Sequence, residues 1–529
     1  MANVIRHKRG TSDPVAGDFS DTAELLINTT DGGLFTKTDG GSVVEIGAGG
    51  GGGGLTEFVE SQETASPNAT TPVDALTATD ASYTNIDVAL VAKGTGATLA
   101  QVPDGTATGG NKRGLRATDL QKSRSNASHV ANGNYSVIAG GESNTAAGLY
   151  STVGGGTANR TSTNYSTVSG GRSNVVQTST FATIAGGDTS SATGQYSFIG
   201  GGRSNAAAGS YGVVAGGYYN VANTSYAFIG GGSFNTTSGN TYTTVVGGYL
   251  NTASGKYSFV GGGKSNVTYT NYSFIGAGES NEALTNTHSA VVGGYLNDAT
   301  GQYSFVGGGQ SNVAGATQSF VGGGYSNAAT GPYGSILGGY DNSSQNSYSA
   351  VLGGYFNLAN GQSSTVVGGS CGSTRGIAGF VALPASDAPI AAVRGVNQSG
   401  LLVLGRQTTD ATATALASNS SAPGTTNQLK LPNNSACAFK GTVIATVTGG
   451  GDTAAWEFKG AIKRGANAAS TAIVGTVIKD VLAYDAGASS WDVAFTADTT
   501  NGGLKVEVTG AAATTIRWVA KLETTEVTY

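Results

Sequence analysis

The sequence has little cysteine and little charge, and it has no long hydrophobic run; each of these scarcities excludes a class of protein. Its two cysteines, Cys371 and Cys437, cannot build a disulfide framework and fit assembly in a reducing compartment. Charged residues make up 11% of the chain and the net charge is −5, which provides no basic surface for nucleic acid. No apolar run reaches the roughly eighteen residues that a membrane-spanning helix requires.

The sequence also lacks the residue groupings of an enzyme centre. Its three histidines, His7, His129 and His288, are far apart, and no metal-ligand spacing or nucleophile–base pair is present. Glycoside hydrolysis needs two carboxyl groups about 5–10 Å apart. The best such pair is Glu282 and Asp298, which we interpret as solvated surface acids. We therefore expect a protein that is not an enzyme and that has no cofactor and no metal.

Glycine is abundant, with 87 residues, and its distribution marks an internal repeat. From Asn134 to Gly372 the sequence repeats a unit of 15 residues, stretched to 16 at three places, that reads approximately Tyr-Ser-x-Val-x-Gly-Gly-x-x-Asn-x-Ala-x-Gly-x. We number positions in the unit from its asparagine, the anchor. The anchors are Asn144, Asn159, Asn174, Ser190 (the one substitute), Asn205, Asn220, Asn235, Asn251, Asn266, Asn281, Asn297, Asn312, Asn327, Asn342 and Asn357.

The positions of the repeat predict its local structure. Position −6 is always Val or Ile, position −3 is always Gly, position +2 is Ala in ten copies, and position −9 is Tyr in twelve. One β-branched and one small residue per copy predict two short strands that each direct one side chain inward. The glycines permit a tight corner, and stacked asparagines can hydrogen-bond from one copy to the next.

A 15-residue unit cannot bury its own face, so the copies must stack into a parallel β-solenoid. Fifteen coils at roughly 4.8 Å each would extend about 70 Å. A packing with three faces, built from groups of three copies that span 46 residues, is the alternative. One Val or Ile and one Ala per coil are a thin core, which favours sharing that core among several chains.

The repeats resemble the head repeats of trimeric autotransporter adhesins, which follow an Asn/Tyr-Ser-x-Ala/Val-x-Gly pattern. In that family three chains share the core of a left-handed parallel β-roll, so the resemblance implies a homotrimer. This sequence differs by an extra residue per coil and a doubled glycine. An autotransporter adhesin also requires an export signal and a C-terminal membrane anchor, and we identify neither.

Residues 1–48 resemble the N-terminal module of many bacteriophage tail fibres, which attaches the fibre to the virion. Two strand-like runs flank Asp31-Gly32-Gly33 and predict a hairpin. The candidate virion-docking residues are Arg6, Lys8 and Arg9. The alternative is that these three residues form a solvated basic arm without a docking role. The six glycines of residues 49–54 predict a flexible hinge.

The remaining segments complete the expected domain order. Residues 55–130 are predicted to form a β-rich shoulder with one short helix over 117–130, and residues 131–372 form the repeat shaft. Residues 373–432 are expected to be a neck, and residues 433–529 an antiparallel β-sandwich tip of about seven strands. This tip resembles the distal domains of phage fibres and tailspikes. All three tryptophans are expected in its core: Trp456, Trp491 and Trp518.

Position −2 of the repeat varies most and carries polar residues, which indicates a solvent-exposed face. Exposed aromatic rows often hold sugar rings, because the face of an aromatic ring stacks on the C–H surface of a sugar. The alternative is that these rings cover backbone or contact a neighbouring chain. The receptor-binding candidates are the six tyrosines at this position: Tyr218, Tyr249, Tyr295, Tyr325, Tyr340 and Tyr355.

The sequence therefore predicts an all-β, homotrimeric tail fibre that is assembled in the host cytoplasm and becomes part of the virion. Its N-terminus would dock to a tail or adaptor protein, and its tip would bind a host surface polysaccharide or lipopolysaccharide. Trivalency would strengthen that binding. We expect no nucleic acid partner and no membrane insertion. The alternatives are a bacterial surface adhesin and a polysaccharide-degrading tailspike.

Overall fold

The structure is a computed structural model, and it describes residues 7–10, 25–28, 34–37, 43–45, 58–63, 73–78 and 92–529. The chain divides into two units, Met1–Val91 and Ala92–Tyr529, which we describe separately. Arg6 and the predicted hinge at residues 49–54 lie outside the described residues, whereas Lys8 and Arg9 lie in a strand.

The first unit contains a four-stranded sheet and a separate hairpin. The sheet has the order β1 (His7–Gly10), β2 (Leu25–Asn28), β3 (Leu34–Lys37) and β4 (Val43–Glu45). Strands β2 and β3 are antiparallel, which confirms the predicted hairpin, and β1 runs parallel to β2. The separate hairpin joins β5 (Phe58–Glu63) to β6 (Val73–Ala78).

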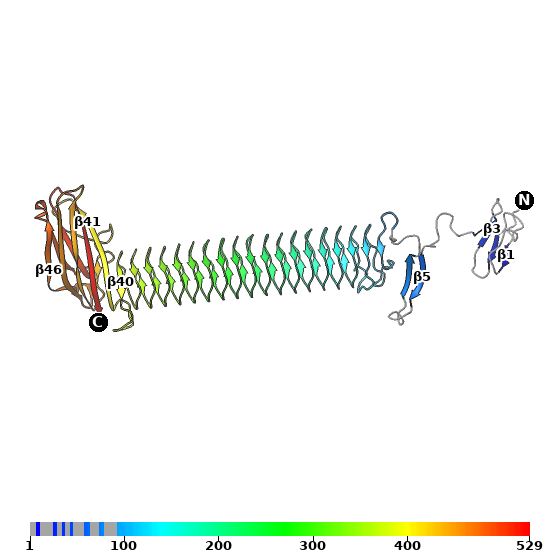
Figure 1. Ribbon diagram of the computed structural model, residues 1–529, viewed down its shortest axis with the longest axis horizontal. Coiled ribbons are helices and arrows are strands. Elements are labelled where there is room, and N and C mark those ends of the chain that lie inside the picture. The colour runs from blue at the N-terminus through cyan, green and yellow to red at the C-terminus, as the bar shows by residue number, and fades with distance from the viewer. Residues whose placement is uncertain are drawn as a thin grey trace. The chain divides into compact units, whose positions relative to one another are not determined.

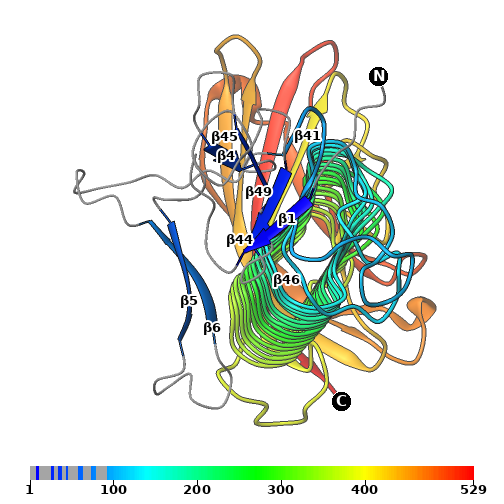
Figure 2. The ribbon, with the colours of Figure 1, turned by 90° about the vertical axis from the view of Figure 1, so that its right-hand side faces the viewer.

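The second unit begins with a parallel β-solenoid, in which each coil contributes one two-residue strand to each of two sheets (Figure 1). Figure 2 looks along the coils and shows them superposed. We call the first sheet the valine sheet, after its inward residues. Its strands are β7 (Thr98–Leu99), β8 (Thr118–Asp119), β9 (Val137–Ile138), β11 (Thr152–Val153), β13 (Thr167–Val168), β15 (Thr183–Ile184), β17 (Phe198–Ile199), β19 (Val213–Val214), β21 (Phe228–Ile229), β23 (Thr244–Val245), β25 (Phe259–Val260), β27 (Phe274–Ile275), β29 (Ala290–Val291), β31 (Phe305–Val306), β33 (Phe320–Val321), β35 (Ser335–Ile336), β37 (Ala350–Val351) and β39 (Thr365–Val366).

The second sheet has fifteen strands, and we call it the alanine sheet. Its strands are β10 (Thr145–Ala146), β12 (Arg160–Thr161), β14 (Val175–Val176), β16 (Ser191–Ala192), β18 (Ala206–Ala207), β20 (Val221–Ala222), β22 (Thr236–Thr237), β24 (Thr252–Ala253), β26 (Val267–Thr268), β28 (Glu282–Ala283), β30 (Asp298–Ala299), β32 (Val313–Ala314), β34 (Ala328–Ala329), β36 (Ser343–Ser344) and β38 (Leu358–Ala359). The predicted two strands per repeat, each with one inward side chain, are therefore confirmed.

Buried asparagines connect successive coils. The backbone N–H of Asn297 donates to Oδ1 of Asn281 (3.0 Å), and the Asn297 Nδ2 donates to the carbonyls of Gly293 and Gly309 (2.9 Å each). The same bonds recur along the shaft, which confirms the predicted hydrogen bonding between asparagines of adjacent copies. An amide suits this position because it accepts one bond and donates two.

The solenoid interior is closed within a single chain. The small number of apolar residues per coil is therefore no longer a reason to expect a core shared among several chains. The Val or Ile at position −6 and the anchor are fully buried, as Ile199 and Asn205 illustrate. Hydrogen-bonded asparagine and serine side chains fill the interior together with the few apolar side chains. Ser151, for example, is buried and donates to the carbonyl of Gly148 (2.8 Å).

The predicted helix over residues 117–130 is wrong, because this segment forms the first part of the solenoid with strand β8 and turns. A buried ion pair closes this end, with Arg113 Nε 2.7 Å from Asp119 Oδ2 and neither side chain exposed. Gln121 takes the place of an anchor: its Oε1 accepts from the Asn144 N–H (2.9 Å), and its Nε2 donates to the Asn144 carbonyl (3.0 Å). Asp119 also pairs with Arg124, and Arg113 donates to the carbonyls of Gly109 and Asn111.

The valine sheet continues into the C-terminal domain through β40 (Val381–Pro384), which is parallel to β39 and antiparallel to the next strand. The six-stranded part of this sheet has the order β40, β41 (Asn397–Thr408), β49 (Ile516–Thr528), β44 (Ser435–Val447), β45 (Thr453–Arg464) and β46 (Ala472–Tyr484). Strand β41 thus belongs to the C-terminal sheet and not to a separate neck.

A second, smaller antiparallel sheet packs on the first. It comprises β42 (Thr414–Ala415), β43 (Leu429–Lys430), β47 (Asp492–Asp498) and β48 (Gly503–Thr509). Phe495 of β47 contacts Phe458 of β45 with ring centroids 4.4 Å apart. The predicted antiparallel sheets are confirmed, and the three tryptophans lie in their core with exposed fractions of 5% or less: Trp456, Trp491 and Trp518.

Candidate functional site

The variable residues at position −2 form a row at one corner of the coils, which we call the bridge row. Each residue makes an isolated parallel bridge with its equivalent one coil further on. The corner depends on the glycine at position −3, where the backbone of Gly294 has a positive φ of 93° and a Cβ would collide with the carbonyl of Gly309. The side chain that follows the glycine is thereby directed outward.

All six predicted receptor-binding tyrosines lie in the bridge row and are 36–48% exposed. The structure brings only three of them together. Tyr325 and Tyr340 are stacked with centroids 4.9 Å apart, and Tyr355 lies 5.4 Å from Tyr340. Stacked rings cover one another's faces, so these three tyrosines present mainly ring edges and hydroxyl groups.

The other three tyrosines are separated from one another by polar residues. Tyr218 packs edge-on against Tyr219 and Phe234, and Tyr249 makes one edge contact with Phe234. In the described part of the chain Tyr295 has no aromatic neighbour, because its partners in the row are Glu279 and Gln310. Tyr295 therefore has the ring face most available for stacking on a sugar.

Ion pairs occupy other places in the same row. Arg172 donates two hydrogen bonds to Asp188, with Nη2 2.7 Å from Oδ2, and these bonds lower the pKa of Asp188 to about 2. Lys264 Nζ lies 2.7 Å from Glu279 Oε1, and this contact raises the pKa of Lys264. The bridge row thus carries charged groups in its first coils, both tyrosines and an ion pair in the coils from Tyr218 to Tyr295, and tyrosines in its last coils.

The aromatic residues at position −9 form a second row. From the sequence alone we did not predict where on the solenoid they lie. We call this row the tyrosine ladder, and its rings stack continuously from Tyr135 to Tyr303 with centroids 4.7–5.4 Å apart. His288 takes one place in this stack, between Tyr272 and Tyr303. The near-constant Tyr at position −9 was the signal that could have revealed the ladder.

The tyrosine ladder stabilises a strained corner. Its residues have positive φ, for example 57° at Tyr211, a conformation that costs a residue with a Cβ roughly 1–2 kcal/mol. The Tyr211 N–H donates to the carbonyl of Gln195 on the preceding coil (2.7 Å), and ring stacking contributes about 0.5–1.5 kcal/mol per pair. Because its ring faces are covered, the ladder offers few faces to a sugar.

The predicted carboxylate pair is adjacent in the structure. Glu282 of β28 and Asp298 of β30 are direct partners in the alanine sheet, and both are half-buried. Burial raises the pKa of Glu282, and the charge of Asp298 raises it further; burial alone raises the pKa of Asp298. Within residues 92–529, no basic side chain forms an ion pair with either carboxyl group.

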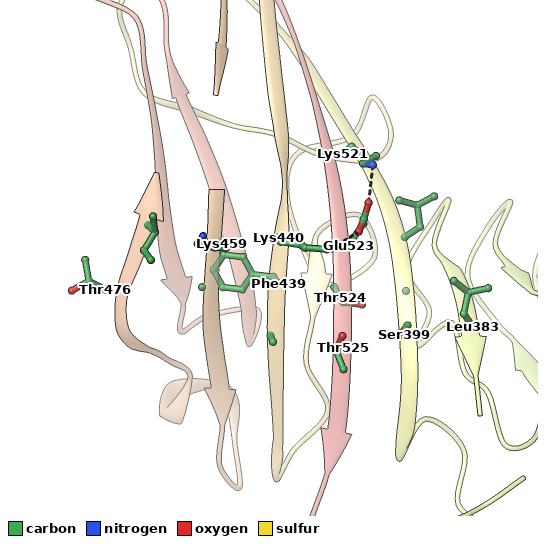
Figure 3. Close-up of a pocket in the computed structure, with 15 residues that line it drawn as sticks. Leu383, Ser399, Phe439, Lys440, Lys459, Thr476, Lys521, Glu523, Thr524 and Thr525 are labelled. Carbon is green, nitrogen blue, oxygen red and sulfur yellow. Dashed lines mark ion pairs between the residues drawn. The ribbon is translucent and has the colours of Figure 1, made fainter. Parts of the chain in front are cut away.

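A cavity of about 780 Å³ opens on the outer face of the six-stranded sheet, across strands β40 to β46 (Figure 3). Leu383, Leu401 and Ile478 provide apolar surface. Glu523 lies 2.7 Å from Lys521 and 3.4 Å from Lys440, and these lysines lower its pKa. Sequence analysis could not find this cavity, because its lining residues are distant in the chain and meet only in the folded sheet.

No metal or membrane site is found in the described residues. In that part of the chain no cluster of three or more His, Cys, Asp and Glu side chains is arranged to hold a metal ion. It likewise contains no helix with the length and hydrophobicity to cross a bilayer. Cys371 and Cys437 are buried and not joined, and burial raises the pKa of Cys437.

Comparisons with known proteins give distant structural neighbours. No protein-family model and no curated protein matches the chain. One similar structure is the tailspike protein gp49 of Acinetobacter baumannii bacteriophage Fri1, a capsular polysaccharide depolymerase, with 9% identity, a TM-score of 0.20 and coverage of 78% of this chain and 79% of that chain. The tailspike protein of Acinetobacter baumannii phage AM24 is also similar, with 7% identity, a TM-score of 0.18 and coverage of 69% and 73%.

The first of these neighbours is described as an enzyme, which contradicts our expectation that the chain is not an enzyme, and that expectation is withdrawn. At these TM-scores the likeness carries no argument about a reaction or a substrate. The functional assignment below therefore depends on the residues and surfaces of this chain.

Proposed function

We propose that this protein is a bacteriophage tail fibre or tailspike that attaches the particle to a polysaccharide on the host surface. The bridge row is the observation that supports this proposal best. It presents tyrosine rings and charged hydrogen-bonding groups at the spacing of the coils, along one corner of the solenoid. A polymer of repeating sugars can occupy several such positions at once, so weak individual contacts add up to firm attachment.

The proposed division of labour follows the order of the chain. Residues 1–48, with Arg6, Lys8 and Arg9, dock to a tail or adaptor protein, and residues 49–54 act as a hinge. The shoulder and the repeat shaft project residues 373–529 away from the particle, and the C-terminal sandwich contacts the host glycan together with the bridge row. The protein acts as a homotrimer in the virion.

Binding of the purified full chain to host cells tests this proposal. We expect saturable binding to host cells, competition by soluble surface polysaccharide from the same host, and no binding to cells stripped of that polysaccharide. Equal binding to host cells and to stripped cells would contradict a glycan receptor. Detection of the protein in purified virions by mass spectrometry tests the assignment to the particle.

The carboxylate pair supports a second function, cleavage of the bound polysaccharide. Glu282 and Asp298 occupy neighbouring strands, which lie about 4.8 Å apart, close to the roughly 5 Å between the carboxyl groups of retaining glycosidases. Their raised pKa values suit one carboxyl group to act as a proton donor and the other, once ionised, as a nucleophile.

Release of oligosaccharides from host polysaccharide by the full chain would support this second function. We expect Glu282→Gln and Asp298→Asn each to abolish release, whereas Asp341→Asn, at an acid of the shaft outside the bridge row, retains it. Full release by both Glu282→Gln and Asp298→Asn would exclude this pair as the catalytic one. No release by the unaltered chain would leave attachment as its function.

A further inference from the structure

The outer face of the valine sheet is apolar along most of the shaft. Its outward residues are those at positions −7 and −5, and none of them is charged in any coil. Leu337, Leu352 and Val292 at position −5 are 57%, 46% and 47% exposed. The charged residues of the coils lie instead in the bridge row, on the outer face of the alanine sheet or in turns, as Arg172, Arg160 and Lys256 illustrate.

Each coil from Phe198 to Val367 contributes one large apolar side chain to this face. Where position −7 is phenylalanine, position −5 is glycine, and in four coils a phenylalanine ring atom lies 3.2–3.5 Å from where a glycine Cβ would be. In the other coils, the residue at position −7 is smaller than phenylalanine and the residue at position −5 is larger than glycine. The phenylalanine–glycine pairs are Phe198/Gly200, Phe228/Gly230, Phe259/Gly261, Phe274/Gly276, Phe305/Gly307 and Phe320/Gly322. Because a large residue at one of the two positions accompanies a small residue at the other, the side chains protrude to a similar height in successive coils. Contact with a second flat surface requires such an even face.

The apolar face continues onto part of the C-terminal sheet, whose outer side also carries the ion-paired Lys440, Lys521 and Glu523. Leu383 of β40 follows Val367 of the last coil, and both are exposed. The same sheet then exposes Val403, Val519 and Ile444 by 47–54%. The cavity described above lies on this face (Figure 3).

Strand β46 ends this sheet as an exposed edge. Among the strands of residues 92–529, the register pairs β46 with β45 alone. Ile478, Val481 and Leu482 are 50–55% exposed. Exposed apolar side chains on an edge strand favour contact with another surface, although Lys479, Asp480 and the bulges in the pairing of β46 with β45 limit strand addition at this edge.

We infer that the outer face of the valine sheet, from the shaft to β46, is the surface on which copies of this chain pack against one another. This inference deepens the proposed homotrimer and rests on it. An identical chain has apolar side chains at the same coil spacing, so it can match this face along its whole length. A polysaccharide would find few hydrogen-bond partners here, because the shaft part of the face consists mainly of Phe, Val, Leu, Ala, Thr and Gly.

The size of the face is sufficient for stable association. Twelve coils at roughly 4.8 Å, with a width of about 10 Å, offer roughly 600 Å². The six strands of the C-terminal domain add on the order of 1,000 Å², and a stable interface needs about 800 Å² from each partner. The bridge row lies at the corner beside this face and stays accessible to a host glycan.

Charge substitutions on the two sheets of the same coils test the inference. The double variant Leu337→Lys/Leu352→Lys alters the valine sheet, and Ser343→Lys/Leu358→Lys is the matched control on the alanine sheet. We expect sedimentation of the full chain to show three copies for the unaltered protein and for the control. The valine-sheet variant should dissociate at protein concentrations at least tenfold higher. Unchanged assembly of that variant would overturn the inference.

Thiol labelling provides a readout that does not depend on tolerance of a buried charge. The natural cysteines are buried, so Leu352→Cys adds an exposed thiol and Leu358→Cys, the more conservative control, adds a half-buried one. We expect Leu352→Cys to be labelled at least tenfold more slowly than Leu358→Cys in the assembled protein. Equal rates, or a monomeric unaltered chain, would overturn the interface. Host binding measured on the same samples reports separately on attachment, since a monomer that still binds leaves the proposed function intact.

Discussion

The shaft and the C-terminal domain are both built from β-strands, yet they are stabilised in different ways. The shaft interior contains one Val or Ile, one small residue and one asparagine per coil, and each asparagine hydrogen-bonds to the next coil. The C-terminal core contains large aromatic residues, with Trp456 and Trp518 5.7 Å apart. Stability in the shaft is therefore divided equally among coils, whereas in the C-terminal domain it is concentrated in a few side chains.

The largest effect is expected in the C-terminal domain. Trp518→Ala removes a side chain that is 1% exposed and whose Nε1 donates to Oγ1 of Thr408 (2.9 Å). We expect a loss of about 3–5 kcal/mol in the free energy of unfolding of this domain, measured by denaturant titration followed by tryptophan fluorescence. The shaft, followed by circular dichroism, should unfold at an unchanged denaturant concentration. A shift in both transitions would mean that the two regions share their stability.

A substitution of one shaft anchor should have a smaller but still large effect. Asn297→Ala leaves the Asn312 N–H and the carbonyls of Gly293 and Gly309 without their bonds to the Asn297 side chain. We expect a loss of about 2–4 kcal/mol, because the Asn312 N–H is buried and the two carbonyls are partly buried. Thermal unfolding of the full chain followed by circular dichroism measures it. A loss below about 0.5 kcal/mol would contradict the role of the asparagines.

Ser190 is the one anchor that is not an asparagine, so the opposite substitution, from serine to asparagine, can be tested there. Ser190 accepts the Asn205 N–H through its Oγ (3.3 Å), but it cannot also donate to two carbonyls as an asparagine does. We expect Ser190→Asn to stabilise the shaft by about 1 kcal/mol in the same thermal assay. A destabilised variant would show that the corner around Ser190 has adapted to the smaller side chain.

The smallest effects concern pH, and two acidic sites of the shaft should respond in opposite directions. The pKa of Asp188 is lowered to about 2, so the stability from its pairing with Arg172 is present above pH 4 and is lost as the pH falls towards 2. The pKa values of Glu282 and Asp298 are raised, so the fold is favoured at a pH below about 4 and this contribution is lost as the pH rises through their folded-state values.

Variants separate these two contributions. We expect Glu282→Gln/Asp298→Asn to flatten the pH dependence of thermal unfolding between about pH 4 and 7, and Asp188→Asn to flatten it below about pH 4. The double variant should also be slightly more stable than the unaltered chain at pH 7. A double variant that is less stable at pH 7 would show that the carboxylates have favourable partners that we have not identified.

The shaft could be predicted from its repeat, because one local structural requirement determines the residue type at each of these positions. Position −6 must fill the interior, the glycine at −3 must turn with a positive φ, and the anchor must bond to two coils. The helix predicted over residues 117–130 was wrong because Thr118 and Asp119 of this segment pair with Val137 and Ile138, which closes the first coil onto the next. That closure is a tertiary contact without a local sequence signal.

The candidate site was predictable only in part. Sequence placed the six tyrosines in one row, but their ring contacts depend on which residues occupy the neighbouring coils, as Tyr295 and Tyr340 show. The stacking of the tyrosine ladder follows from coil geometry and was not predicted. The cavity on the C-terminal sheet joins residues from Leu383 to Thr525, a distance in sequence that no local pattern can bridge.

The most direct test of this account compares the two tyrosine rows in binding to purified host polysaccharide by calorimetry. We expect Tyr249→Ala/Tyr295→Ala, in the bridge row, to weaken binding by the full chain about tenfold, or about 1.4 kcal/mol. Tyr211→Ala/Tyr226→Ala, in the tyrosine ladder, should bind like the unaltered chain, because those rings already stack on each other. Weaker binding by the ladder variant together with unchanged binding by the bridge-row variant would contradict the assignment of the bridge row as the glycan-binding surface.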